Sequence, residues 1–140
     1  MKLSVALLSL SLIAAAAAPA MAVSADEEKD VVTAELDKCL EAPEGQTTAG
    51  MVECTHNAYM AYDKQLNDVY KKALVGVDKA SADKIRESQR KWIAWRDAQR
   101  EADNGAWRAD RGTLASLDIE SFNVDAIKAR VQQLQYYVSE

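Results

Sequence analysis

Apolar side chains recur at steps of three and four residues over most of this chain, which is the period of amphipathic helices. The longest such run predicts a helix of about seven or eight turns. Its inner positions are Met51, Cys54, Ala58, Tyr62, Leu66, Val69, Ala73 and Val77. Thr47 or Thr48 can cap its first turn. No stretch shows the alternation of apolar and polar residues that is typical of strands.

A shorter helix precedes this one. Ser24 to Glu27 matches a capping box, and the segment from Pro43 to Gly45 ends the helix. Its apolar positions are Val31, Val32, Leu36, Cys39 and Leu40.

Two further helices follow the long one. A short break from Asp78 to Ser81 opens the third helix, with Ser81 as its cap. The inner face of this helix carries Ile85, Ser88, Gln89, Trp92, Trp95, Arg96 and Gln99. The periodicity fails near Asp103, and we expect a loop from there to Asp118. Ser121 or Asn123 opens the last helix, whose inner face carries Val124, Ile127, Val131, Leu134 and Val138.

The connection between the second and third helices is short, which favours an antiparallel hairpin. The sequence therefore predicts an all-α fold. We expect a small helical bundle of about four helices, built on a long antiparallel helical hairpin and closed by one disulfide.

Residues 1–22 have the features of a secretory signal peptide. Lys2 supplies the positive charge, an apolar run extends from Leu3 to Ala18, and Ala20-Met21-Ala22 is a small-x-small cleavage site. The apolar run is too short and too rich in alanine for a transmembrane helix. We expect cleavage after Ala22, which leaves residues 23–140 as a single helical domain in the periplasm.

Charge argues against one class of partner. The whole chain has a formal net charge of −5, and loss of Lys2 makes it −6. A nucleic-acid binder would show a basic stripe instead. A mildly acidic protein can attract a cationic partner.

Cys39 and Cys54 are the two cysteines of the chain. In an oxidising compartment, an isolated pair predicts a disulfide. A redox-active pair would have the C-x-x-C spacing, and a zinc site needs about four ligands. The pair is therefore interpreted as structural.

When the second and third helices are aligned antiparallel about a turn at Lys79 and Ala80, several of their polar side chains lie opposite one another. The level pairs are Asp63 with Arg96, Asn67 with Trp92, and Tyr70 with Gln89. An inward guanidinium needs a carboxylate, because an unpaired buried charge is costly. Asp63 is the expected partner of Arg96, and Asp97 is the alternative. We interpret the six residues as a structural polar network that sets the helical register. A ligand-binding or catalytic cluster is the alternative interpretation.

Evidence for an enzyme or a metalloprotein is weak. His56 is the only histidine, and with Glu53 it forms one Glu-x-x-His step. Di-iron bundles use two such steps and further carboxylates. His56 also lacks an evident nucleophile beside it. We therefore expect a non-enzymatic protein with no catalytic residue, no metal and no cofactor.

The expected loop after the third helix carries Trp107, Arg108 and Arg111. Tryptophan and arginine are enriched at binding hot spots, so these three residues are a candidate partner-binding surface. The alternative is that Trp107 folds back and covers the open end of the bundle.

The combined motifs resemble the LprI-like lysozyme-inhibitor domain family. They comprise Cys54, then Asp63-x-x-Leu66-Asn67-x-x-Tyr70, then Gln89-Arg90-x-Trp92-Ile93-x-x-Arg96-Asp97. The resemblance extends from about Cys39 to Asp97. It implies a helical, exported and cysteine-bearing domain. Many members carry a cysteine after the Arg-Asp pair and a later partner, but this chain has Ala98-Gln99-Arg100 and no cysteine after Cys54.

The resemblance implies a binding module that inhibits a cell-wall lytic enzyme, and a lysozyme-type muramidase is the expected protein partner. The alternative is an envelope-stress or chaperone-like helical protein with an unidentified ligand. Neither function requires nucleic acid, or membrane insertion after the signal peptide is removed.

Overall fold

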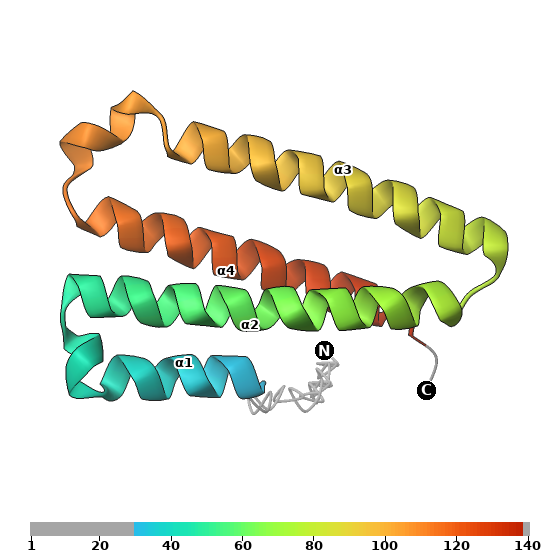
Figure 1. Cartoon of the computed structure of the whole chain (residues 1–140), viewed down its shortest axis with the longest axis horizontal. Coiled ribbons are helices and arrows are strands. Elements are labelled where there is room, and N and C mark those ends of the chain that lie inside the picture. The colour runs from blue at the N-terminus through green and yellow to red at the C-terminus, as the bar shows by residue number, and fades with distance from the viewer. Residues whose placement is uncertain (1–29, 139–140) are drawn as a thin grey trace, which may run out of the picture.

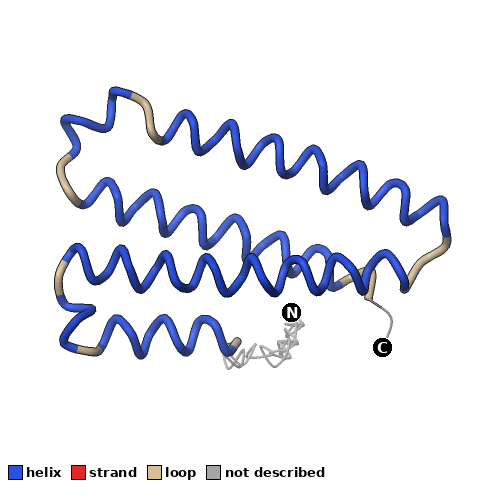
Figure 2. Tube along the Cα trace, in the orientation of Figure 1, coloured by secondary structure: helices blue, strands red, loops and turns tan. Residues whose placement is uncertain are grey.

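The computed structural model describes residues 30–138, and all of its regular structure is helical (Figures 1 and 2). The elements in chain order are α1 (Val31–Glu41), η1 (Pro43–Gln46), α2 (Thr48–Val75), α3 (Lys79–Asp103), η2 (Ala106–Arg111) and α4 (Leu114–Gln135). The predicted all-α fold with a long helical hairpin is confirmed.

Helices α1, α2 and α3 alternate in direction, and α4 runs parallel to α2 (Figure 1). The closest packing in the bundle is between α2 and α4. Helix α1 packs on α2, whereas α3 approaches α2 closely over only a short stretch. The hairpin therefore opens toward η2, and α4 occupies the core position that the sequence assigns to α3.

The core lies between α2 and α4. Leu66 of α2 is buried, and Ile127 and Leu134 of α4 are completely inaccessible to solvent. The other large buried side chains of this cluster are Tyr59, Tyr62, Val69, Ile85, Val124 and Val131. Because Ile85 is the only member from α3, the first half of that helix is its main anchor. Most inner positions expected for α2 and α4 are buried. Met51, Val77 and Val138 are only partly buried, and the last two lie beyond the ends of their helices.

The N-cap of α2 was predicted correctly from the sequence, whereas that of α3 was not. The Thr47 hydroxyl accepts the N–H of Gly50 at 3.0 Å, as predicted. Helix α3, however, begins at Lys79 because the carboxylate of Asp78 accepts the N–H groups of Ala80 and Ser81. Asp78 is therefore the cap, and the assignment of Ser81 was wrong. A carboxylate also gains from the positive end of the helix dipole, which a serine hydroxyl does not.

The start of α4 also differs from the prediction. The helix begins at Leu114 rather than near Ser121, and much of the expected loop is the 3-10 helix η2. Gly112 turns the chain between them with φ of 69°, a conformation that favours glycine. Thr113 makes no side-chain cap to α4. The helix start therefore carries no capping signal that the sequence could reveal.

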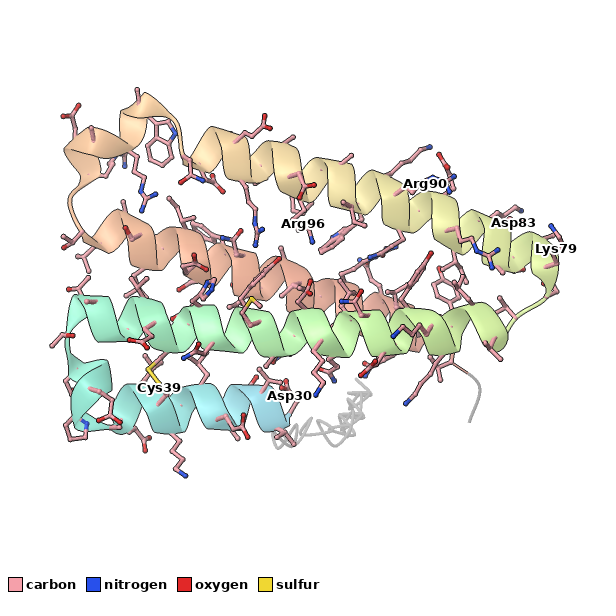
Figure 3. All side chains as sticks on the ribbon, in the orientation of Figure 1. Asp30, Cys39, Lys79, Asp83, Arg90 and Arg96 are labelled. Atoms are coloured by element: carbon pink, nitrogen blue, oxygen red, sulfur yellow. A yellow bond between two sulfur atoms is a disulfide. The ribbon has the colours of Figure 1, made fainter. Side chains whose placement is uncertain are left out.

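Helix α1 contributes no fully buried residue. Its Val32 and Leu36 side chains are partly buried against the core, and two further attachments hold the helix. One attachment is the predicted disulfide between Cys39 and Cys54, with a Cα–Cα distance of 5.7 Å. Cys39 lies near one end of the helix and Asp30 precedes the other (Figure 3). The capping box predicted at Ser24 to Glu27 lies outside the described residues.

The second attachment of α1 is a group that we call the Asp30 cluster: Asp30, Thr33, Tyr62 and Lys128. The Asp30 carboxylate accepts the backbone N–H of Thr33 at 3.0 Å and the Tyr62 hydroxyl at 2.7 Å. The Lys128 ammonium lies 2.9 Å from Asp30 and donates to the Thr33 hydroxyl at 2.9 Å. Four side chains thus join α1, α2 and α4, and α1 is held at both ends.

The protonation of this cluster follows from its contacts. Burial by itself would raise the pKa of Asp30, but hydrogen bonds from Lys128, Thr33 and Tyr62 outweigh it and hold that pKa well below its usual range. Lys128 has a raised pKa because Asp30 accepts a hydrogen bond from it. The cluster is therefore an ammonium–carboxylate pair at neutral pH.

We expect removal of the disulfide to loosen α1 first. The double substitution Cys39→Ser with Cys54→Ser should lower the free energy of unfolding by about 3 kcal/mol, because the cysteines are 15 residues apart and close a loop of that size. Urea denaturation with and without a reductant measures this loss. Amide hydrogen exchange should accelerate in α1 before it does in α2. Equal acceleration in both helices would contradict the attachment described here.

We expect Asp30→Ala to cost about 2 kcal/mol of stability, because it removes a helix cap, an acceptor of the Tyr62 hydroxyl and the carboxylate partner of Lys128. Asp78→Ala is the matched control, since Asp78 is also an aspartate N-cap and its carboxylate bonds Ala80 and Ser81 of its own helix. The loss measured by urea denaturation should be smaller for the control. Equal losses would mean that the Asp30 cluster adds nothing beyond capping.

The contribution of Asp30 should depend on pH. Its folded pKa is lowered, so its stabilisation is present above the unfolded pKa of about 3.9 and is lost as pH falls toward the folded value. The stability difference between the unmodified protein and Asp30→Ala should be constant from pH 6 to 8 and should shrink below about pH 4. Urea denaturation across this range measures it, and a difference independent of pH would contradict the ion pair.

Candidate functional site

The second half of α3 is the least covered part of the bundle. All the buried residues of this helix, Ala82, Ile85 and Gln89, lie in its first half. Beyond Gln89, the side chains that face α4 are only partly covered or are exposed. Half of the Trp95 side chain is accessible to solvent, at 52%. This region therefore offers large side chains that the core does not use.

A cavity of about 220 Å³ lies between this half of α3 and α4. We call it the aromatic groove. The residues that define its character are Tyr59, Trp92, Trp95, Arg96, Asp103 and Phe122. Small-molecule pockets usually measure about 300–1,000 Å³, so the groove is below that range. It suits one inserted side chain of a protein partner better than a cofactor.

Arg96 does not pair with Asp63 as the register predicts. Its Nε and Nη2 atoms donate to Asp97 at 2.9 and 2.8 Å, and its guanidinium lies 5.5 Å from the centre of the Trp92 ring. The alternative partner, Asp97, is thus the observed one. Burial acts to lower the pKa of Arg96, but the hydrogen bond with Asp97 and the Coulomb attraction of Tyr59, Asp97 and Asp63 together outweigh it, and the pKa is raised. Because α3 diverges from α2, Asp63 acts on this pKa only through weaker Coulomb attraction.

The other members of the predicted polar network also have separate partners. The Asn67 amide donates to the Asp63 carboxylate at 3.2 Å within α2. Gln89 is buried and accepts a hydrogen bond from Nε of Arg130 at 2.9 Å. Tyr70 packs against the edge of the core. The six residues therefore fall into four separate local groups rather than one network between α2 and α3.

The predicted partner-binding residues lie on η2. Trp107 is 50% exposed, and its indole Nε1 donates to the carbonyl of Ala102 at 2.7 Å. The Arg111 guanidinium lies 5.7 Å from the centre of the Trp107 ring. Arg108 instead donates to Asn104 at 3.0 Å and to the Ser116 hydroxyl, so it links the end of α3 to the start of α4. The indole is anchored at one edge while half of the side chain remains accessible.

The inward positions of Lys128 and Arg130 were not predicted from the sequence. Arg130 follows Ile127 by three residues and precedes Leu134 by four, so the helical period alone places it on the inner face of α4. Lys128 follows Val124 by four residues and carried the same signal. The contact of Lys128 with Asp30 had no local signal, because the two residues are brought together only by packing of three helices.

His56, the candidate metal ligand, has a carboxylate nearby. His56 Nδ1 lies 3.6 Å from Glu120 Oε2 at the surface of the bundle. Within residues 30–138, no group of three or more His, Cys, Asp and Glu side chains could hold a metal ion. In the same part of the chain, no helix is both long enough and apolar enough to cross a membrane.

A similar fold is found in a protein of known structure. The crystal structure of an uncharacterized protein from Burkholderia thailandensis is similar, with a TM-score of 0.73 and 19% sequence identity. The match covers 78% of this chain and 53% of that protein, so this chain spans about half of its length. At this identity the likeness shows the fold alone. No curated protein matches the chain.

The model of one protein family matches residues 39–134, which is more than half of the chain. The matched range includes the disulfide, the whole of α2 and α3, η2, and α4 almost to its end. The chain therefore belongs to the family described as lysozyme inhibitor LprI.

Proposed function

We propose that this protein is an exported periplasmic binding module that inhibits a lysozyme-type muramidase. Membership of the family described as lysozyme inhibitor LprI is the observation that carries this proposal. The description is that of an inhibitor rather than an enzyme. In this proposal residues 1–22 direct export and residues 23–140 form one inhibitory domain.

Trp107 and Arg111 are the proposed contact residues. The indole of Trp107 is held in place by its bond to Ala102, so little side-chain freedom would be lost when a partner binds. The guanidinium of Arg111 rests near the same ring and is exposed. Muramidases of the lysozyme type keep two carboxylates in a cleft, and an arginine can bind a carboxylate through two hydrogen bonds. Arg108 would support this pair, because its own donors are used within the domain.

Charge supports the same partner. The domain is acidic overall, whereas Arg111 is a local positive charge at one end of the bundle. A cationic lytic enzyme would be attracted to the acidic domain, which accelerates association. The arginine would then meet the acidic cleft of that enzyme. The aromatic groove beside η2 would accept one side chain from the rim of the cleft.

A chaperone-like function is the second candidate, and the exposed aromatic side chains near the groove favour it. Phe122 is 69% exposed and Trp95 is 52% exposed. Such side chains could hold unfolded segments of other envelope proteins. Suppression of the aggregation of a reduced client protein, without inhibition of any muramidase, would support this function over the first.

We expect residues 23–140 to inhibit a lysozyme-type muramidase in a dose-dependent manner. Trp107→Ala and Arg111→Ala should each weaken inhibition by about tenfold or more, because truncation of a hot-spot residue typically costs about 2 kcal/mol of binding. Residual muramidase activity is measured against increasing inhibitor concentration. Circular dichroism and urea denaturation confirm that each variant is folded.

Arg86→Ala is the matched control. Arg86 is an exposed arginine on the first half of α3 and pairs with Asp83, far along the helix from η2. Its removal should leave inhibition unchanged. If no muramidase of several types is inhibited at micromolar concentrations of the unmodified protein, the proposed function is wrong. If inhibition persists unchanged in both η2 variants, the contact residues lie elsewhere.

A further inference from the structure

A second cavity, of about 370 Å³, lies between the first half of α3 and the end of α4. Its polar lining consists of Ser81, Lys84, Ser88, Arg130 and Tyr137, and two apolar side chains complete it. No carboxylate from the described residues lines this cavity. It lies toward the end of α3 that is remote from η2 (Figure 1), so it is separate from the proposed inhibitory surface.

Arg130 is the unusual member of this lining because it is only 8% exposed. Its nitrogens donate to the side chains of Gln89 at 2.9 Å, Ser88 at 3.1 Å and Gln133 at 3.1 Å. All three acceptors are neutral. Among the described residues, no aspartate or glutamate is within ion-pair distance of the guanidinium, and two of its five N–H donors remain beyond these three bonds.

A buried guanidinium normally has a carboxylate partner, since a charge without one is costly to bury. Two other inward cations of this bundle have such a partner. Lys128 pairs with Asp30, and Arg96 pairs with Asp97. Burial lowers the pKa of Arg130, yet arginine remains charged in proteins. The cavity therefore contains a buried positive charge that the described residues do not neutralise.

The neighbouring groups match the needs of a small anion. Lys84 adds a second positive charge at the wall of the cavity. The Ser88 hydroxyl accepts a bond from Arg130, so its own proton is available to donate. The Ser81 hydroxyl is already directed to Asp78 at 2.6 Å, so Ser81 contributes no donor. The available donors are those of Arg130, Lys84, Ser88 and Tyr137.

We propose that this cavity binds a small oxyanion, either a phosphate group or a carboxylate, on Arg130 and Lys84. Both ligand types present oxygens that match the planar donor set of arginine. Ser88 positions the guanidinium and donates to the bound anion. The anion supplies the negative charge that the buried arginine lacks, so binding stabilises the folded domain.

The proposal is tested with residues 23–140 in sodium phosphate, sodium acetate and sodium chloride at matched ionic strength. Thermal unfolding and isothermal titration calorimetry are the measurements. Phosphate or acetate should raise the Tm in a saturable manner with one site per chain, beyond the effect of chloride. The stronger of the two identifies the anion as phosphate-like or carboxylate-like.

Variants locate the site. Lys84→Ala should weaken anion binding by about tenfold, the loss expected for one charge-assisted hydrogen bond, and Ser88→Ala should weaken it less. Both side chains are exposed enough for the fold to tolerate their removal. Lys91→Ala, an exposed lysine two turns along α3 and outside the cavity, is the matched control and should bind as the unmodified protein does.

Two results would overturn the proposal. One is a Tm that responds equally to the three salts, which would reflect general screening. The other is equal anion affinity in Lys84→Ala, Ser88→Ala and the unmodified protein. The NMR signal of the Arg130 Nε–H group provides a readout that does not depend on stability. It should shift on addition of the bound anion and should not shift with chloride.

Discussion

The packing of α2 against α4 is the interaction on which the other features of this bundle depend. Ile127 and Leu134 are completely buried against the apolar face of α2 that carries Leu66. Because α4 covers that face, α3 is left to pack through its first half alone. Helix α1 has no fully buried side chain, and its Val32 and Leu36 pack against the core while partly buried. The dominance of one helix pair thus produces both a helix attached at its ends and a helix with an uncovered half.

Polar interactions hold the parts of the bundle that lie outside the α2–α4 core. The Asp30 cluster and the disulfide at Cys39 hold α1 at its two ends. Three inward cations have different surroundings. Lys128 has a carboxylate from another helix, Arg96 has one from its own helix, and Arg130 has neutral acceptors among the described residues. Similar side chains therefore serve attachment, local order and, in our proposal, anion binding.

The uncovered half of α3 leaves large aromatic side chains accessible toward η2. Trp95 and Trp107 are each about half exposed, and in our proposal Trp107 contacts the partner. Arg108 connects α3 to α4 across this end, so the surface is held without the additional disulfide of many LprI-like domains. The indole of Trp107 is anchored to the carbonyl of Ala102, while half of the residue remains exposed.

The sequence alone determined that there are four main helices, most inner positions of α2 and α4, the cap at Thr47 and the Cys39–Cys54 disulfide, because helical period, capping chemistry and cysteine pairing are local or nearly so. It did not determine η2 or the start of α4 at Leu114. The family resemblance followed from the same residues. Only the tertiary structure decided which helices are neighbours. The level pairing of Asp63 with Arg96 assumed a closed hairpin, whereas the partner of Arg96 is Asp97. Apolar faces on three helices could each have packed into the one core. Which of them packs best depends on how the side chains of all the helices fit together, and no single stretch of sequence contains that information.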